Sequence, residues 1–245
     1  MPQNIYDDPD FFTAYASMPR SVHGLDGAPE WPSLAGLLPP LEGRRVVDLG
    51  CGFGWFARWA AARGAASVLG VDLSRRMLER AVRETDDARI TYHLADLDAL
   101  ELPPAAFELA FSSLALHYLT DLDRLVGTVR RSLVPGGAFV FSVEHPVYTA
   151  PTSPGVVDVG GRPVWPLDAY QREGPRTTDW LAPGVVKQHR TLTTYLGTLL
   201  RHGFTVGGFE EWRPTTAQLE EHPDWAVELD RPTFLLLAAS VGGGG

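Results

Sequence analysis

The residues best suited to chemistry first gather in a glycine-rich turn, Asp48-Leu49-Gly50-Cys51-Gly52-Phe53-Gly54. Because glycine lacks a Cβ, backbone amides in such a turn can approach a ligand closely. A dinucleotide fingerprint starting at Gly50 would need its third glycine at position 55, where this chain has Trp55. No Gly-Lys-Ser/Thr follows, as a phosphate-binding loop requires. The carboxylate of Asp48 would repel a diphosphate, so the turn favours a cationic ligand, such as a sulfonium with an amino-acid tail.

Further carboxylates follow the next two apolar runs. Asp72 comes twenty-two residues after Gly50, and a carboxylate there can accept both hydroxyls of a ribose. Nicotinamide-binding and S-adenosylmethionine-binding sheets share that feature, so it does not separate them. Asp96 and Leu97 come after the following run, where an acid can accept the exocyclic amine of adenine and an apolar side chain can cover the ring. Asp98 is a neighbour that could take the place of Asp96.

The elements that must position these residues alternate between strand and helix. Short apolar runs predict buried strands at 45–49, 67–71, 89–94, 107–112 and 138–143. Alanine-rich or helically spaced apolar segments predict helices at 53–63, 74–82 and 120–133, the last one ended by Pro135-Gly136-Gly137. This alternation predicts a parallel sheet with helices on both faces. Ligands of such sheets bind at the carboxyl ends of the strands, where the glycine turn lies.

The remainder of the chain departs from that alternation. A helix is expected at 191–202, and apolar runs at 204–211 and 233–240 fit an antiparallel pair at one sheet edge. Residues 146–189 hold 12 prolines and glycines among 44 residues, yet also Tyr148, Trp165, Tyr170 and Trp180. A long irregular segment in a compact domain is typical of a lid or binding loop, and its aromatic residues argue against disorder. We therefore expect a substrate lid at 146–189, a helical N-terminal cap at 1–40 and a flexible tail at 242–245.

Five blocks in matching order and spacing resemble the class I S-adenosylmethionine-dependent methyltransferases, in their small-molecule, type 11 branch. These blocks are residues 46–54, 71–74, 95–97, 107–114 and 133–137. The resemblance implies a single α/β domain over residues 1–245. Its Rossmann-like sheet would have seven strands, the last one antiparallel, with helices on both faces and an inserted lid. The resemblance also implies S-adenosyl-L-methionine as methyl donor and S-adenosyl-L-homocysteine as product.

The same resemblance implies a set of cofactor-binding residues. Gly50 and Gly52 would face the methionine part, Asp72 would hold the ribose, and Arg20 would pair with the cofactor carboxylate. Ser112 or Ser113 would line the end of the fourth strand. The full set is Tyr15, Arg20, Asp48, Gly50, Gly52, Asp72, Leu73, Asp96, Leu97 and Ser112.

The candidate catalytic residues are two histidines at strand ends. His145 is expected as the general base and His117 as the second choice, because imidazole titrates near neutral pH. Neither need act as a base if the acceptor is an amine, and either could instead be a packed histidine. Lid residues expected to touch the substrate are Tyr148, Trp165, Tyr170 and His189.

The expected reaction is methyl transfer to an oxygen or nitrogen of a small molecule. The Asp/Asn-Pro-Pro-aromatic signature of nucleobase amino methylation is absent, and Ser112-Ser113-Leu114-Ala115 stands in its place. Two alternatives are a nicotinamide-dependent oxidoreductase and a non-catalytic S-adenosylmethionine-binding protein. Trp55 at the third glycine position counts against the oxidoreductase.

Composition restricts the partners and the compartment. The 245 residues carry a net charge of −9, which disfavours binding to long nucleic acids. Cys51 is the single cysteine, so the chain has no internal disulfide, and no ligand spacing for a metal is apparent. There is no apolar run of membrane-spanning length and no signal-peptide pattern at the start, so we expect a cytoplasmic protein, as a monomer or homodimer.

Overall fold

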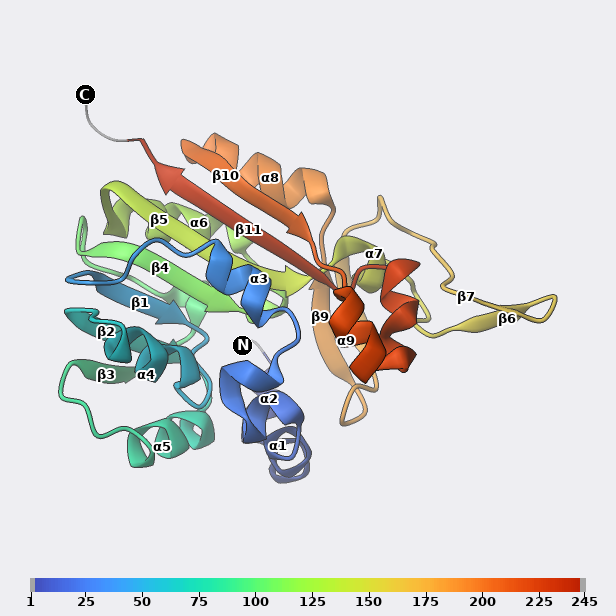
Figure 1. The fold of residues 1–245 in the computed structure, drawn as a ribbon. Coiled ribbons are helices and arrows are strands. Elements are labelled where there is room, and N and C mark those ends of the chain that lie inside the picture. The colour runs from blue at the N-terminus through green and yellow to red at the C-terminus, as the bar shows by residue number, and fades with distance from the viewer. Residues whose placement is uncertain (1–2, 243–245) are drawn as a thin grey trace.

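The computed structural model describes residues 3–242, which form an α/β fold around a seven-stranded sheet. The strand order is β10-β11-β5-β4-β1-β2-β3. The strands are β1 (Arg45–Leu49), β2 (Ser67–Asp72), β3 (Ile90–Leu94), β4 (Phe107–Ser113), β5 (Leu133–Glu144), β10 (Phe204–Glu211) and β11 (Phe234–Val241). β11 is antiparallel to both of its neighbours, β5 and β10. The expected fold class is thereby confirmed, including the antiparallel pair at one edge (Figure 1).

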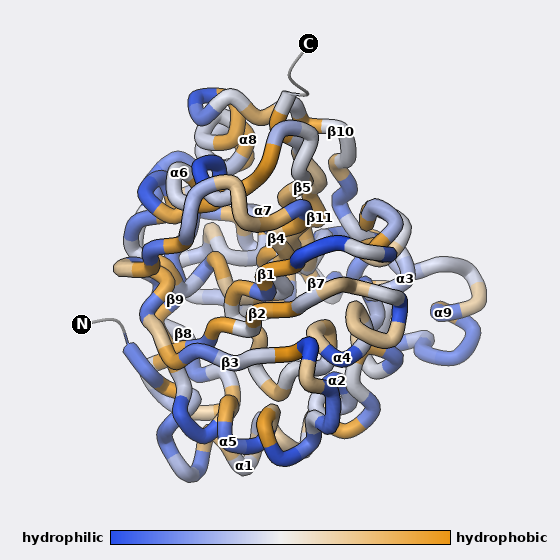
Figure 2. Tube along the Cα trace, turned by 90° about the vertical axis from the view of Figure 1, so that its left-hand side faces the viewer, coloured by the Kyte–Doolittle hydropathy of each residue, from blue (hydrophilic) through white to orange (hydrophobic). Residues whose placement is uncertain are grey.

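Helices cover both faces of this sheet because its strands are apolar on both sides. α6 (Leu122–Ser132) and α8 (Leu192–Arg201) pack on one face, while α3 (Trp31–Gly36) and α4 (Trp55–Ala62) pack on the other. Strand alternation divides the core between them, since Leu235 and Leu237 belong to one cluster and Leu236 to the other. Apolar residues accordingly run along the central strands in Figure 2.

α5 (Arg75–Arg83) and α6, which follow β2 and β4 in the chain, each begin at a residue whose side chain caps the helix. The Ser74 hydroxyl accepts from the Met77 N–H at 3.1 Å and opens α5. The Asp121 carboxylate accepts from the Arg124 N–H at 2.9 Å and opens α6. Each cap satisfies a backbone donor that has no partner within its own helix.

One predicted boundary is wrong. Pro135-Gly136-Gly137 does not end α6, which stops at Ser132, but lies within β5. The ladder between β4 and β5 shifts here, since Phe107 pairs with Leu133 whereas Leu109 pairs with Ala138. Proline has no N–H to give to a ladder and Gly136 has a φ of 78°, so the pairing with β4 is interrupted by a bulge at this point.

The N-terminal residues form short helical pieces that lie below the carboxyl ends of the strands (Figure 1). These pieces are η1 (Ile5–Asp7), α1 (Pro9–Ala16), α2 (Pro19–Val22) and η2 (Gly24–Gly27). Gln3 ties this segment to the region 146–189, because its side chain donates to the Gly184 carbonyl and accepts from the Val186 N–H, both at 2.8 Å.

The region 146–189 is more regular than the sequence suggested. It contains α7 (Pro146–Thr149) and two antiparallel hairpins, β6 (Val157–Val159) with β7 (Arg162–Val164) and β8 (Gly174–Thr178) with β9 (Val185–His189). The β6–β7 hairpin projects away from the body in Figure 1. The remaining elements are η3 (Leu97–Ala99), η4 (Leu116–Tyr118), α9 (Thr216–Glu221) and η5 (Pro223–Leu229). Of the tail expected to be flexible, 243–245 lie outside the described residues.

Within residues 3–242, no helix combines the length and the apolar character needed to cross a bilayer.

Candidate active site

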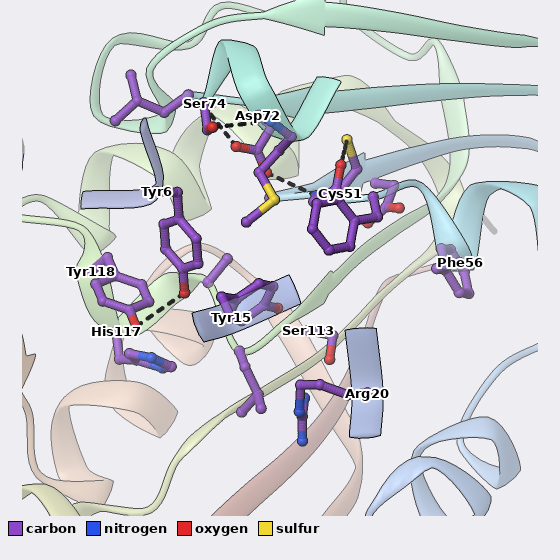
Figure 3. A pocket seen from close by; sticks show the side chains of 18 of the residues that line it. Tyr6, Tyr15, Arg20, Cys51, Phe56, Asp72, Ser74, Ser113, His117 and Tyr118 are labelled. Atoms are coloured by element: carbon purple, nitrogen blue, oxygen red, sulfur yellow. Dashed lines mark hydrogen bonds between the residues drawn. The ribbon is translucent and has the colours of Figure 1, made fainter. Parts of the chain in front are cut away.

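A cavity of about 320 Å³ lies at the carboxyl ends of β1, β2, β4 and β5. The glycine turn and Asp72 line it, and so do residues of the N-terminal segment and Trp180. Figure 3 shows Asp72, Ser74 and Cys51 across the cavity from His117, with Tyr6 and Tyr15 between them. This is the position at which sheets of this kind bind ligands.

The glycine turn brings its backbone against the cavity. Gly50 has a φ of 77°, and a Cβ at this position would lie 2.3 Å from the Cβ of Ala115. The Gly50 N–H donates to the Val71 carbonyl at 2.8 Å, which fixes the turn between β1 and β2. Any side chain at position 50 would therefore be strained and would clash.

Asp48 is a buried carboxylate that lacks a full set of partners. It is 2% exposed, and its Oδ2 has no hydrogen-bond partner among the described residues. Burial raises the pKa of Asp48 well above its ordinary value, and the nearby charge of Asp72 adds to this effect. A cationic group, or a donor on a bound ligand, would relieve both conditions.

Asp72 is oriented by two backbone N–H groups. Its Oδ2 accepts from Gly52 and its Oδ1 from Ser74, each at 2.8 Å. Burial raises the pKa of Asp72, against the lowering effect of these hydrogen bonds. Each oxygen retains capacity for one more donor, which suits a vicinal diol.

Asp96 and Asp98 differ in their hydrogen bonds. Both line the cavity together with Leu97. The Asp98 carboxylate accepts from the Thr120 hydroxyl at 2.7 Å and from the backbone N–H groups of Thr120 and Asp121, so it serves the start of α6. Asp96 accepts only from the Asp98 N–H among the described residues, at 2.9 Å, and remains open to a ligand.

The N-terminal residues Tyr15 and Arg20 reach the cavity as expected. One guanidinium nitrogen of Arg20, Nη2, lies 3.1 Å from each carboxylate oxygen of Glu30, a buried residue. The other guanidinium nitrogens retain N–H groups for an anion. The Tyr15 ring lies edge-on to Trp180, with ring centroids 6.3 Å apart, and this contact joins the N-terminal segment to the region 146–189.

Of the two serines expected at the end of β4, one lines the cavity. Ser112 is fully buried, and its hydroxyl donates to the Leu49 carbonyl at 2.7 Å. Ser113, the next residue along the strand, points to the opposite side and lines the cavity. Ser113 is therefore the serine that can face a ligand in this cavity, and Ser112 is not.

The two candidate histidines are placed differently. His117 lines the cavity, and its Nδ1 accepts from the Glu144 N–H at 3.3 Å. Burial lowers the pKa of His117 well below its ordinary value, and the positive charges of Lys187 and Arg190 add to this.

His145 is not among the described residues that line the cavity. Its Nδ1 accepts from the Val147 N–H at 3.0 Å, and its Nε2 lies 2.9 Å from Glu211 Oε1. Both ring nitrogens are thus engaged in holding α7 and the end of β10. His145 therefore does not line the cavity, because it lies one residue past β5 and its side chain caps the start of α7.

Only some of the lid residues reach the cavity. Tyr148 and Trp180 line it, whereas Trp165, Tyr170 and His189 do not. Trp165 stacks on Tyr148 with ring centroids 5.3 Å apart, and it donates to the Val147 carbonyl at 3.0 Å. His189 Nδ1 lies 2.8 Å from the Thr149 hydroxyl, and Nε2 lies 2.8 Å from the Tyr170 carbonyl. Trp165 thus supports Tyr148 directly, while His189 joins Thr149 to Tyr170 within the region 146–189.

Several residues of the cavity wall were missed from the sequence. Tyr6 and Tyr118 line it, and their hydroxyls are hydrogen-bonded at 3.2 Å. Glu144 also lines it and forms an ion pair with Lys187. The position of Glu144 directly before His145, at the end of a buried strand, is the one signal in the sequence that could have found it.

No group of three or more His, Cys, Asp or Glu residues within 3–242 is arranged to hold a metal ion.

Comparison with known proteins fits this geometry. A family profile described as a methyltransferase domain matches residues 47–141. An S-adenosylmethionine-dependent methyltransferase from Mesorhizobium loti is 58% identical, with a TM-score of 0.85, and the match covers 89% of this chain and 100% of that one. A structure from Listeria monocytogenes is 41% identical, with a TM-score of 0.82, over 89% and 99% of the two chains.

The malonyl-[acyl-carrier protein] O-methyltransferase of Erwinia pyrifoliae is 39% identical over 104 residues, which is 42% of this chain and 38% of that enzyme. The shared part is thus well under half of either protein. Since the relative from Mesorhizobium loti is matched over its whole length, S-adenosylmethionine is the methyl donor here also. The chain belongs to the class I S-adenosylmethionine-dependent methyltransferases.

Proposed function

We propose that this methyltransferase acts on an oxygen or nitrogen of a small molecule that binds beside the cofactor, under residues 146–189. The observation that carries the proposal is the division of one cavity into two chemically different ends. The glycine turn lies with Asp72 at one end, and His117 lies across from them beside Glu144, whose partner Lys187 contacts Trp180. Tyr148 lines the same cavity. With a net charge of −9 the chain offers little attraction to nucleic acids, so we propose no such partner. We propose a monomer or homodimer, and gel filtration of the full chain tests this.

The residues at the acidic end fit S-adenosylmethionine. Asp72 would accept the ribose hydroxyls beside Leu73, while Asp96 and Leu97 would hold the adenine. Gly50 and Gly52 would face the methionine part, near the unpartnered oxygen of Asp48. Arg20 and Tyr15 would close this end, with Arg20 toward the cofactor carboxylate. When bound, S-adenosylmethionine supplies a methyl group on a positively charged sulfur, which an acceptor attacks in line.

The protein's own contribution is mainly alignment and exclusion of water. Holding two reactants in the correct geometry is worth up to about 7–11 kcal/mol of the barrier. We propose that residues 3–40 act as a cap and residues 146–189 as a substrate lid, because Gln3 and Tyr15 join these segments over the cavity. His145 is not proposed as the base, since both of its ring nitrogens are engaged.

The malonyl-[acyl-carrier protein] O-methyltransferases support a methyl donor site of the same kind and leave the acceptor open, because the shared residues cover only 42% of this chain. The test of the donor site is the substitution Asp72→Ala. We expect it to weaken S-adenosylhomocysteine binding by at least 100-fold in titration calorimetry, about 2.7 kcal/mol or more. Asp86→Ala, at an exposed position, is the matched control and should keep the affinity. A folded Asp72→Ala protein with unchanged affinity would overturn the assignment.

A further inference from the structure

Glu144, the last residue of β5, lines the cavity, and its two carboxylate oxygens have different surroundings. Lys187 Nζ from β9 donates to Oε1, and the Lys187 ammonium lies 4.6 Å from the centroid of the Trp180 ring. Oε2 is buried and has no hydrogen-bond partner among residues 3–242. A buried carboxylate oxygen without a donor costs stability, and nothing in the fold relieves that cost.

A bound ligand can supply the missing donor. The Glu144 side chain is 13% exposed and lines the cavity. Rotation about the terminal bond of a glutamate side chain is soft, so a small turn of the carboxyl group brings Oε2 to the cavity surface. Lys187 keeps the side chain in place at Oε1 during such a turn.

His117 offers the complementary group beside it. Its Nδ1 accepts the Glu144 main-chain N–H, so in the neutral ring the proton is on Nε2. The lowered pKa of His117 keeps the ring neutral near pH 7. Nε2 has no hydrogen-bond partner among the described residues, and Figure 3 shows the ring at the cavity wall next to Tyr118. His117 is therefore a hydrogen-bond donor here and not a base.

These two groups restrict the chemical class of the nucleophile. It must donate a hydrogen bond to Glu144, accept one from His117, and still attack the methyl carbon. A hydroxyl has one hydrogen and two lone pairs, so it can donate to Glu144, accept from His117 and still direct a lone pair at the methyl carbon. A neutral amine has a single lone pair, which cannot both accept from His117 and attack. A carboxylate has no hydrogen to donate, and Glu144 would repel it.

Resting on the function proposed above, we infer that the acceptor is an alcohol or phenol and that Glu144 is its general base. The hydroxyl oxygen forms the new bond to the methyl carbon, and the bond from that carbon to sulfur breaks with its electron pair kept by sulfur. The hydroxyl proton passes to Glu144 Oε2. Tyr148, Trp180 and Phe234 line the same cavity, so the hydroxyl is carried on an apolar or aromatic frame.

The first test uses the wild-type protein and three acceptors that share a benzene ring but carry a hydroxyl, an amino or a carboxylate group. Phenol, aniline and benzoate are titrated into the complex with S-adenosylhomocysteine by NMR, and each is offered with S-adenosylmethionine for turnover. We expect phenol to bind and to be methylated on oxygen at least tenfold faster than aniline or benzoate. Preference for aniline or benzoate, or failure of all three to bind, overturns the inference.

The second test is Glu144→Gln, with Glu220→Gln on exposed α9 as the matched control. We expect Glu144→Gln to lower turnover of phenol by about 10²-fold or more, as for loss of a general base, while S-adenosylhomocysteine affinity stays within threefold. Unchanged turnover overturns the role of Glu144. If this variant does not fold, the wild-type comparison of the three acceptors decides.

These outcomes separate the two proposals. If aniline is methylated and cofactor binding depends on Asp72, the inference of a hydroxyl acceptor is wrong, but the proposed small-molecule function still holds. Loss of the Asp72 dependence would instead overturn the donor site itself.

Discussion

At the scale of single residues, the Asp48 carboxylate lowers the stability of the folded protein but suits a cationic ligand. Its carboxylate is buried, one of its oxygens lacks a partner, and Asp72 lies near enough to raise its pKa further. An acid whose pKa is raised in the folded state costs stability as the pH rises through that pKa. The folded protein without ligand therefore bears an electrostatic strain that a cationic ligand relieves.

We predict that Asp48→Asn stabilises the protein and weakens its hold on the cofactor. The neutral amide removes a buried charge, so the free energy of unfolding at pH 7 should rise by about 1 kcal/mol or more. Affinity for S-adenosylhomocysteine should fall at least tenfold in calorimetry, because its cationic amino group loses a counter-charge. Asp86→Asn, exposed, serves as control and should change neither quantity. A variant that is less stable and binds equally well would contradict this account.

Residue type and spacing were enough to find the glycine turn and the acids that follow the strands, because those features act through local backbone geometry. They were not enough to choose between neighbours at strand ends. Either Ser112 or Ser113 was expected to line the end of β4, and only Ser113 lines the cavity. At the end of β5, His145 was expected and Glu144 lines the cavity instead. A strand that is buried on both faces has no polar alternation to show which side a residue takes.

At the scale of elements, the lid is a layered support for one aromatic wall. Tyr148 on α7 lines the cavity, Trp165 stacks behind it, and the Arg231 guanidinium lies 4.7 Å and 4.5 Å from the centroids of these two rings. Trp165 also holds the Val147 carbonyl through its indole N–H. The wall is therefore positioned by residues that do not touch the cavity.

We predict that Trp165→Ala weakens acceptor binding without affecting the cofactor. The ring stack is worth about 0.5–1.5 kcal/mol and the hydrogen bond about 1 kcal/mol, so KM for an acceptor should rise about tenfold. S-adenosylhomocysteine affinity should stay the same in calorimetry. Val159→Ala on the exposed β6 is the control for a change elsewhere in the lid. Equal KM values in Trp165→Ala and wild type would show that Tyr148 does not depend on this support.

The sheet and its helices were predictable because hydrophobic periodicity and helix caps depend on residues that are close together in the sequence. The hairpins of the lid were not, because contacts with distant segments stabilise them. Gln3 bonds to Gly184 and Val186, and Lys187 pairs with Glu144. The bulge at Pro135-Gly136-Gly137 was missed for a similar reason, since β4 supplies the pairing that extends the strand past these residues.

At the scale of the whole molecule, three histidines have a lowered pKa for the same reason, which is burial. Burial lowers the pKa of His117, His145 and His189, so the folded protein resists protonating them. All three rings are engaged in hydrogen bonds that hold the cavity wall or the lid. Asp48 and Asp72, with raised pKa values, act in the opposite sense and offset part of this effect.

We therefore predict that stability falls as the pH falls from about 7.5 to 5.5. Unfolded histidines take up protons through their ordinary pKa near 6.5 while the folded ones stay neutral, so the unfolded state binds more protons in this window. Each such histidine contributes at most about 1.4 kcal/mol per pH unit below 6.5. We expect urea unfolding to show a total loss of about 1–3 kcal/mol.

The variant His189→Asn isolates the contribution of His189 to the pH dependence of the free energy of unfolding. This comparison does not depend on how the substitution changes the absolute stability. Its free energy of unfolding should depend less steeply on pH than that of wild type over the same window, because one fewer proton is taken up on unfolding. His222→Asn, at an exposed position, should keep the wild-type slope. Identical slopes in His189→Asn and wild type would mean that His189 already carries its proton in the folded lid, and that the lid is held by a charged ring and not by a neutral one.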